Sequence, residues 1–281
     1  MARLQDRLCG GSSQQRAIRK GVPLVRLFRS VIRSVKLTAF FIFGALELAI
    51  KRPATRELRA EWLHQFAAKT VRKMGVEVRF EGHFPTHGAI VANHMGYLDI
   101  MAIAAAHRVV FVSMIEMQSV PLLGWMTTMS GTVYVERGRG GSAARARAGL
   151  QAAAAAGVPV VFFPEGVTSN GASVAKFHSG ILAQVLEAGE PVTAAFVRYR
   201  LTEDNGPGVT LENDICYWGD HMTLFPHIFK ILGLRGIEVT VQIANAPIAF
   251  TAAPGDRKHA AEEARAAVME LGGVRDAVAA G

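Results

Sequence analysis

The sequence predicts an α/β domain with a mixed central sheet flanked by helices, preceded by an amino-terminal helical hairpin. After Gly75, short runs rich in β-branched residues alternate with alanine-rich helical runs, which is typical of this class. Hydrophobic residues make up 50% of the 281 residues, enough for a sizeable core. We expect three parts: the hairpin in residues 1–74, the α/β domain in 75–251, and a linker with a final helix in 252–281.

The first helix of the hairpin is expected from the apolar run 37–50, which follows a basic segment and is closed by Lys51 and Arg52. These 14 residues span about 21 Å as a helix, less than the ~30 Å hydrocarbon core of a bilayer, and Glu47 lies among them. The late start of the run argues against a secretory signal. We expect a helix that dips into one leaflet with cations at the headgroups; a transmembrane helix and a buried core helix are the alternatives.

The second helix is expected over residues 56–73, with its apolar side chains loosely on one side. These side chains are Leu58, Trp62, Leu63, Phe66 and Val71. Together the two helices predict a hairpin that docks on lipid. We therefore expect the protein at the cytoplasmic face of the inner membrane, as a monotopic or single-pass protein.

The α/β part is expected to contain seven strands and three helices. The strands are expected at 76–80, 89–92, 109–113, 132–135, 158–163, 192–198 and 237–243. The helices are expected at 95–106, 141–156 and 179–188. The order of these runs along the chain indicates a mixed sheet.

The composition narrows the classes of partner. The formal charge of +8 suits a membrane surface or a phosphorylated substrate, and the mean hydropathy of +0.23 favours a membrane. We expect no nucleic-acid partner, because the basic residues do not interleave with aromatic residues and no zinc-finger or RNA-binding signature is present. Cys9 and Cys216 have no neighbours at metal-ligand spacing, so we interpret them as unpaired thiols and expect no metal site.

The strongest candidate for chemistry is the pair His94 and Asp99. The strand expected at 89–92 would deliver Asn93 and His94 to its carboxyl end, where α/β sheets usually bind ligands. Asp99 would lie about one helical turn further and could bind one ring nitrogen of His94. The other nitrogen would then be free to accept a proton, as in the base half of a catalytic triad. A histidine at a helix start with a stabilising aspartate is the alternative.

Two further segments are candidates for binding a polar headgroup. The run Phe163-Pro164-Glu165-Gly166 follows an apolar strand, so Glu165 and Gly166 would also lie at a carboxyl strand end; a plain turn is the alternative. Arg137 lies in a glycine-rich loop before a helix, a setting that suits phosphate. An ordinary solvated basic loop is the alternative there.

In this order, the motifs resemble the lysophosphatidate acyltransferase family of glycerolipid acyltransferases. The resemblance covers residues 76–248 and includes four motifs: Asn93-His94-x4-Asp99, residues 131–137 with Arg137, Phe163-Pro164-Glu165-Gly166, and Glu190-Pro191-Val192. Nucleophile-elbow, P-loop, zinc-protease and dinucleotide signatures are absent from the sequence.

The resemblance implies that His94, oriented by Asp99, deprotonates the hydroxyl of a lysolipid acceptor. The oxygen would attack the thioester of acyl-CoA or acyl carrier protein, without an acyl-enzyme and without a cofactor. Asn93, Arg137 and the Glu165–Gly166 turn would bind the acceptor.

The acceptor is less defined by this resemblance, because Val167 and Thr168 stand where the family commonly has threonine and arginine. We expect lysophosphatidate first, since Arg137 and the net charge suit an anionic acceptor. Lyso-ornithine lipid or another lysophospholipid is the alternative acceptor. A non-catalytic membrane-binding scaffold is the alternative from another class.

Overall fold

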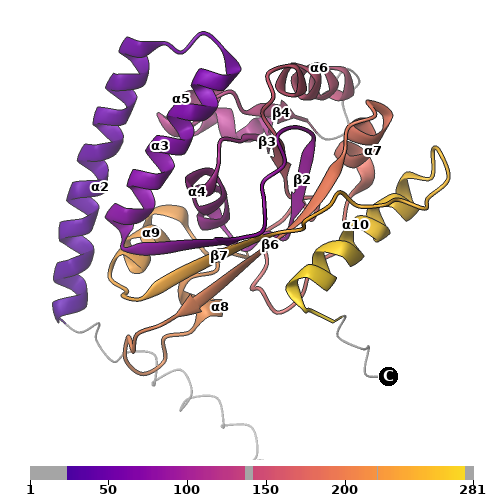
Figure 1. Ribbon diagram of the computed structural model, residues 1–281. Helices are drawn as coiled ribbons and strands as arrows, with labels where there is room; N and C mark the ends of the chain where they lie inside the picture. The colour runs from indigo at the N-terminus through magenta and orange to yellow at the C-terminus, as the bar shows by residue number, and fades with distance from the viewer. Residues whose placement is uncertain (1–23, 137–141, 220, 276–281) are drawn as a thin grey trace, which may run out of the picture.

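The computed structural model describes residues 24–136, 142–219 and 221–275, and its strands form one mixed sheet (Figure 1). The strands are β1 (Val76–Glu81), β2 (Ala89–Ala92), β3 (Val110–Met114), β4 (Val133–Val135), β5 (Val160–Phe162), β6 (Val192–Leu201) and β7 (Ile237–Ile243). Their order across the sheet is β1-β7-β6-β2-β5-β3-β4. β6 and β7 pair antiparallel and the other neighbours pair parallel, which confirms the predicted mixed sheet.

Helices cover both faces of this sheet. They are α2 (Leu24–Lys51), α3 (Arg56–Met74), α4 (Tyr97–Ala106), α5 (Leu123–Met129), α6 (Ser142–Ala155), α7 (Ser179–Glu187), α8 (Leu211–Asp214), α9 (Leu224–Leu232) and α10 (Arg257–Gly272), with a 3₁₀ turn at Ile115–Ser119. Helices α3, α4 and α9 pack on one face, and α6, α7 and α10 pack on the other. Helix α2 lies outside this layer, against α3 and α9 (Figure 1).

Strand β2 lies in the middle of the sheet, and Asn93 and His94 follow directly at its end. Ile90 and Ala92 pack toward the side of α3 and α4, whereas Ala89 and Val91 pack toward the side of α7 and α10. All four residues are buried, as expected for a parallel strand covered by helices on both faces. The strand therefore holds the residues that follow it at a fixed position.

The two amino-terminal helices lie side by side, joined by a short turn. Helix α3 begins where the Thr55 hydroxyl accepts a hydrogen bond from the Leu58 N–H, and ends at Gly75, whose φ of 77° is in the left-handed region. The Phe66 ring contacts Phe40 and Phe41 of α2, with ring centroids 5.0 Å apart in both pairs. Of the five apolar residues predicted on one side of α3, Leu58 does not belong there, since it is 55% exposed.

Helix α2 begins at Leu24, well before the apolar run that predicted it, because part of its basic segment binds the core. The Arg29 guanidinium donates to the carbonyl of Gly233 at 2.8 Å. The Arg33 guanidinium donates to the carbonyls of Leu232 and Leu234 at 3.2 and 2.8 Å. These carbonyls lie at the end of α9, where a cation also offsets the helix dipole. Arg29 and Arg33 thus bind the end of α9, and the expectation that the cations before the apolar run lie at headgroups stays a prediction.

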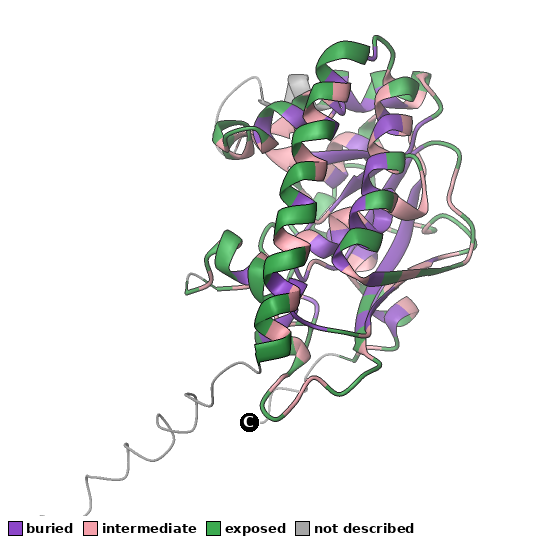
Figure 2. Cartoon of the chain, turned by 90° about the vertical axis from the view of Figure 1, so that its left-hand side faces the viewer, coloured by how far each residue is buried: buried purple, intermediate pink, exposed green. Residues whose placement is uncertain are grey.

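One face of α2 is exposed from end to end (Figure 2), and many of its exposed residues are apolar. Its large exposed residues are Leu24, Val25, Leu27, Phe28, Val31, Ile32, Val35, Ile42, Phe43, Leu46 and Ile50. We call these residues the outer face of α2. In the described parts of the chain, no helix is both long enough and apolar enough to cross a membrane. The predicted membrane association of the hairpin stays a prediction at this point.

Candidate active site

The site is built where β2 ends and α4 begins. The Asn93 side chain is buried, and its amide bonds both backbone groups of Val197 in the neighbouring strand β6: the Asn93 NH₂ donates to the Val197 carbonyl at 3.0 Å, and the Val197 N–H donates to the Asn93 oxygen at 2.7 Å. Asn93 thus fixes the end of β2 to β6. Its predicted contact with the acceptor stays a prediction.

The structure brings His94 and Asp99 into contact. The Nδ1 atom of His94 lies 2.8 Å from the Asp99 carboxylate, which also accepts the N–H groups of Met95 and Gly96 at 2.6 and 3.0 Å. Because a carboxylate only accepts hydrogen bonds, Nδ1 carries the proton and Nε2 presents its lone pair. The Asp99 side chain is fully buried, whereas 17% of the His94 side chain is exposed. The pair therefore has the arrangement of a general base with an orienting carboxylate.

Tyr199 on β6 is a member of this site that sequence reasoning missed. Its hydroxyl donates to the second oxygen of the Asp99 carboxylate. Burial raises the pKa of Tyr199, and the charge of Asp99 raises it further, so the hydroxyl stays protonated as a donor. Tyr199 lies 100 residues from Asp99 in the chain, so no local pattern signals this contact.

Glu165 holds the backbone of residues 93–96, which we call the His94 turn. One oxygen of its buried carboxylate accepts the N–H of His94 at 2.6 Å, and the other accepts the N–H of Ala175 at 2.7 Å. Burial raises the pKa of Glu165, and the two backbone N–H groups oppose that shift. Since both oxygens bind backbone groups, the carboxylate positions His94; its predicted contact with the acceptor stays a prediction.

Two further segments clamp the same turn. The ring of Phe163 stacks on the ring of His94, with centroids 4.0 Å apart and planes 11° from parallel. The N–H of Ser169 donates to the carbonyl of His94 at 2.9 Å, and the N–H of Tyr217 donates to the carbonyl of Met95 at 2.8 Å. The imidazole is thus held on one face by an aromatic ring and at its backbone from both sides.

Of the other two residues predicted to bind the headgroup, the structure describes Gly166 but not Arg137. Gly166 has a φ of 68°, in the left-handed region that glycine adopts without strain, and its N–H donates to the carbonyl of Phe163 at 3.1 Å. This turn lets Glu165 fold back toward His94. Arg137 lies outside the described residues, and its contact with the acceptor stays a prediction.

An aromatic cluster beside the turn was also missed. The Tyr97 hydroxyl lies 3.1 Å from Nδ1 of His227, and the ring centroid of Tyr217 lies 5.3 Å from that of His227. Burial lowers the pKa of His227 to about 4, and the charge of Lys230 contributes. His227 is therefore neutral near pH 7. Nearby, Cys216 is a free buried thiol whose pKa burial raises to about 12.

Cys9, the other cysteine interpreted as unpaired, lies outside the described residues. Within the described ranges, no three His, Cys, Asp or Glu side chains come together in a group that could hold a metal ion.

Comparison with known proteins agrees with the resemblance that the sequence motifs indicated. Residues 75–198 match the model of the family described as Acyltransferase. The lyso-ornithine lipid O-acyltransferase of Pseudomonas aeruginosa is 34% identical over 149 residues, which are 53% of this chain and 56% of that protein. The enzyme of the same name from Rhodobacter capsulatus is 30% identical over 210 residues, which are 72% of each chain.

The 1-acyl-sn-glycerol-3-phosphate acyltransferase of Neisseria gonorrhoeae is 32% identical over 127 residues, which are 45% of this chain and 50% of that protein. The crystal structure of the 1-acyl-sn-glycerophosphate (LPA) acyltransferase PlsC from Thermotoga maritima has the same fold, with a TM-score of 0.57 and 20% identity over 86% of this chain and 98% of that one. These matches confirm the family that the sequence motifs indicated. The chain therefore belongs to the glycerolipid acyltransferase family, the family of enzymes that acylate lysolipids.

Proposed function

We propose that this enzyme transfers a fatty acyl group from an acyl thioester to the free hydroxyl of lyso-ornithine lipid, with His94 as the general base. The observation that carries the chemistry is the His94 imidazole, fixed by Asp99 through Nδ1 at 2.8 Å. Among the described residues, no hydrogen-bond partner occupies Nε2, so this atom can accept a proton. The thioester is that of acyl-CoA or acyl carrier protein, and no further cofactor takes part.

The proposed reaction has two steps. Nε2 of His94 removes the proton of the acceptor hydroxyl while its oxygen forms a bond to the thioester carbonyl carbon. When the tetrahedral intermediate collapses, the carbon–sulfur bond breaks and the thiolate takes the proton back from Nε2. Asp99 stays ionised and stabilises the imidazolium that exists between the steps. The products are an ester and a free thiol.

Two observations support lyso-ornithine lipid as the acceptor. Four of the curated relatives carry that name, and one of them, from Brucella abortus, aligns with 83% of this chain. Val167, directly after the Phe-Pro-Glu-Gly run, is 57% exposed and offers no charge to a phosphate. The second candidate is lysophosphatidate, which we expected first; the Neisseria relative and the net charge of +8 favour it.

We further propose that the enzyme works at the cytoplasmic face of the inner membrane, with the outer face of α2 in one leaflet. The support is physical: an apolar face of this extent is unfavourable in water, and each large side chain that it buries contributes about 1.5–3 kcal/mol. Monotopic insertion agrees with the length and composition of α2. The division into residues 1–74, 75–251 and 252–281 belongs to this proposal.

The test combines purified protein, an acyl thioester and a panel of lysolipids, and measures thiol release. We expect release with lyso-ornithine lipid that exceeds release with lysophosphatidate. His94→Ala should abolish it, whereas His83→Ala, which removes an exposed histidine, should not. Full activity of His94→Ala would overturn the mechanism, and faster release with lysophosphatidate would overturn the acceptor. Vesicle binding without thiol release from any acceptor would instead indicate a scaffold.

A further inference from the structure

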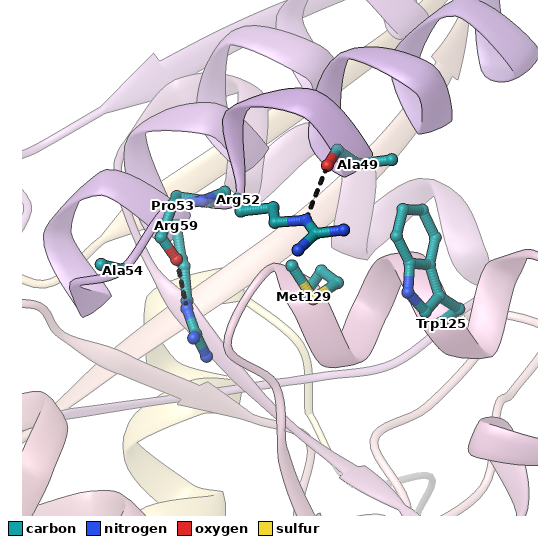
Figure 3. A pocket seen from close by; sticks show the side chains of 7 residues that line it. All are labelled: Ala49, Arg52, Pro53, Ala54, Arg59, Trp125 and Met129. Carbon is teal, nitrogen blue, oxygen red and sulfur yellow. Dashed lines mark hydrogen bonds between the residues drawn. The ribbon is translucent and has the colours of Figure 1, made fainter.

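A pocket of about 380 Å³ lies where α2 turns into α3, and the proposed reaction does not use it (Figure 3). Its walls come from the end of α2, the start of α3 and from α5. The lining residues are Ala49, Arg52, Pro53, Ala54, Arg59, Trp125 and Met129. The walls are thus mostly apolar and carry two arginines. Such a mixture suits an amphiphile with an anionic group.

The pocket lies far from His94. Strand β1 runs antiparallel to β2, because it pairs parallel with β7 and β7 pairs antiparallel with β6. Helix α3 leads into β1, so its last turn lies at the edge of the sheet where His94 follows β2. The pocket lies at the first turn of α3, and 19 residues of helix span about 28 Å. A ligand here does not reach the reacting atoms.

The arginines at this pocket are held in place by single backbone contacts. Nε of Arg52 donates to the carbonyl of Ala49 at 3.1 Å, and Nε of Arg59 donates to the carbonyl of Pro53 at 3.0 Å (Figure 3). No ion pair joins either side chain to a carboxylate among the described residues. The terminal nitrogens of both guanidinium groups therefore remain available to an anion.

Arg52, Arg56 and Arg59 lie within a segment of eight residues at the pocket, and the acid in that segment is the exposed Glu57. Arg56, beside the pocket, donates to the carbonyl of Gly131 at 3.3 Å. Burial lowers the pKa of Arg56, and the charge of Arg59 lowers it further. Of the nearby acids, Glu47 pairs with Lys51, and Glu61 lies 3.8 Å from Arg108. A bound anion would relieve the repulsion between these arginines.

The backbone at the pocket is strained on both sides. In the described chain, the non-glycine residues with positive φ are Arg52, at 40°, and Leu122, at 62°, one turn before Trp125. A backbone conformation with positive φ is sterically unfavourable for residues that carry a Cβ and costs about 1–3 kcal/mol each. Strain of this kind clusters at functional sites, and here it directs the Arg52 side chain across the pocket (Figure 3).

The surroundings identify the kind of amphiphile. Next to the pocket, Leu46 and Ile50 of α2 are 54% and 81% exposed, and Leu122 and Trp125 are 47% and 40% exposed. Leu46 and Ile50 belong to the outer face of α2, and Leu122 and Trp125 add exposed apolar side chains on the α5 side of the pocket. Tryptophan is enriched at the level of lipid headgroups, with arginine beside it binding phosphate. An acyl chain could thus cover the apolar residues while its phosphate binds the arginines.

We propose that this pocket binds the phosphate of an anionic membrane phospholipid that is not the substrate. The bound lipid fixes the α2–α3 turn to the membrane, far from the catalytic edge. The proposal rests on the membrane association proposed above.

The experiment measures sedimentation with vesicles of phosphatidylcholine, with and without about 30% phosphatidylglycerol. Binding to phosphatidylcholine alone tests membrane association, whereas the increase caused by phosphatidylglycerol tests the pocket. We expect Arg52→Gln/Arg59→Gln to reduce that increase about thirtyfold, since each cation near an anionic surface contributes a factor of about five. Binding to phosphatidylcholine and thiol release in detergent should stay unchanged.

The matched control is Arg257→Gln/Lys258→Gln, which removes the same charge from exposed positions on α10, across the molecule from α2 (Figure 1). An equal loss in this control would reduce the effect to net charge and overturn the site. The site would also be overturned if Arg52→Gln/Arg59→Gln were folded, as judged by circular dichroism, and kept the full increase in binding caused by phosphatidylglycerol.

Titration calorimetry separates a lipid from a free anion. We expect soluble dihexanoyl phosphatidylglycerol to bind the full-length protein, and the Arg52→Gln/Arg59→Gln variant to lose that binding. Equally tight binding of inorganic phosphate would show a simple anion site and contradict the lipid.

Discussion

The His94 turn and the outer face of α2 are both unusual in what they bury: charged side chains are buried at the turn, whereas α2 exposes large apolar ones. At the turn, the charged side chains of Asp99 and Glu165 are 0% and 1% exposed, and each oxygen has a donor. On α2, Phe28 and Phe43 are 66% and 69% exposed, and no described part of the chain covers them. Every buried carboxylate oxygen at the turn accepts a hydrogen bond, whereas large apolar side chains of α2 stay in contact with solvent. The difference indicates that the charged groups at the turn are already paired within the protein, whereas the outer face of α2 is suited to an apolar partner.

The largest effect is expected from Asp99→Asn, which disrupts the paired charges at the turn. The asparagine amide has one oxygen, yet the Asp99 carboxylate accepts from four donors on two oxygens. Its NH₂ group would face a donor, and the imidazole would lose its fixed tautomer. We expect thiol release to fall about 10³- to 10⁴-fold.

The control for this variant is Asp204→Asn, which changes an exposed aspartate in a turn. Circular dichroism should show that both variants fold. If Asp99→Asn keeps more than a tenth of the activity, the saturated network is not what orients His94.

The α2 side of the comparison is tested by Phe28→Ser/Phe43→Ser. Both rings are exposed, so their removal should change the free energy of unfolding by less than about 1 kcal/mol. Vesicle binding should weaken about a hundredfold or more, because each ring contributes about 1.5–3 kcal/mol on burial in lipid. Sedimentation with phosphatidylcholine vesicles measures this.

Phe80→Ser provides the control, since Phe80 on β1 is 54% exposed and is not part of α2. Equal weakening in both variants would mean that α2 has no special role at the membrane. Substitution is a sharper test than deletion of α2, because deletion would also uncover Phe66, which packs against Phe40 and Phe41.

A smaller effect is expected from Tyr199→Phe, which removes one donor to Asp99 and keeps the ring. A buried hydrogen bond of this kind contributes about 1–3 kcal/mol, so we expect loss of stability in that range and about tenfold slower thiol release. Tyr134→Phe, which removes a hydroxyl bonded to Thr127, is the control. Unchanged kcat in Tyr199→Phe would show that three donors suffice for Asp99.

The smallest effect concerns pH and His227. Its pKa is about 4 in the folded protein and 6.5 in the unfolded chain, so between these values the unfolded chain binds more protons. The stability from neutral His227 is present above pH 6.5 and is lost as the pH falls toward 4. We expect the Tm of the wild type to fall more steeply in this window than that of His227→Gln. Parallel Tm curves would show that burial does not perturb His227.

The sequence predicted the central strands better than the outer helices. Strands β2 and β7 have the predicted bounds because their buried, β-branched runs are interrupted sharply at both ends. The first half of α2 was missed because its arginines resemble a solvated segment, whereas Arg29 and Arg33 bind the end of α9. Helix α9 was also missed, and it contains Pro226 in its first turn, where proline is tolerated.

The sequence predicted the central pair of the candidate site, His94 and Asp99, but missed the residues around that pair. His94 and Asp99 are five residues apart, and a strand followed by a helix brings such neighbours together, so the spacing was informative. Tyr199 and His227 come from distant parts of the chain: the pairing of β6 with β2 places Tyr199 near the turn, and the packing of α9 on the sheet places His227 there. Glu165 was predicted at the site, but the structure gives its carboxylate to the backbone of His94 and Ala175.

The hydrogen bonds from Arg29 and Arg33 to the end of α9 connect α2 to the site. Helix α9 carries His227, which contacts Tyr97 at the start of α4, directly after the His94 turn. A chain of direct contacts therefore runs from α2 through the last turn of α9 to the aromatic cluster beside His94. We expect a tilt of α2, such as a change in bilayer curvature would cause, to be felt at that cluster.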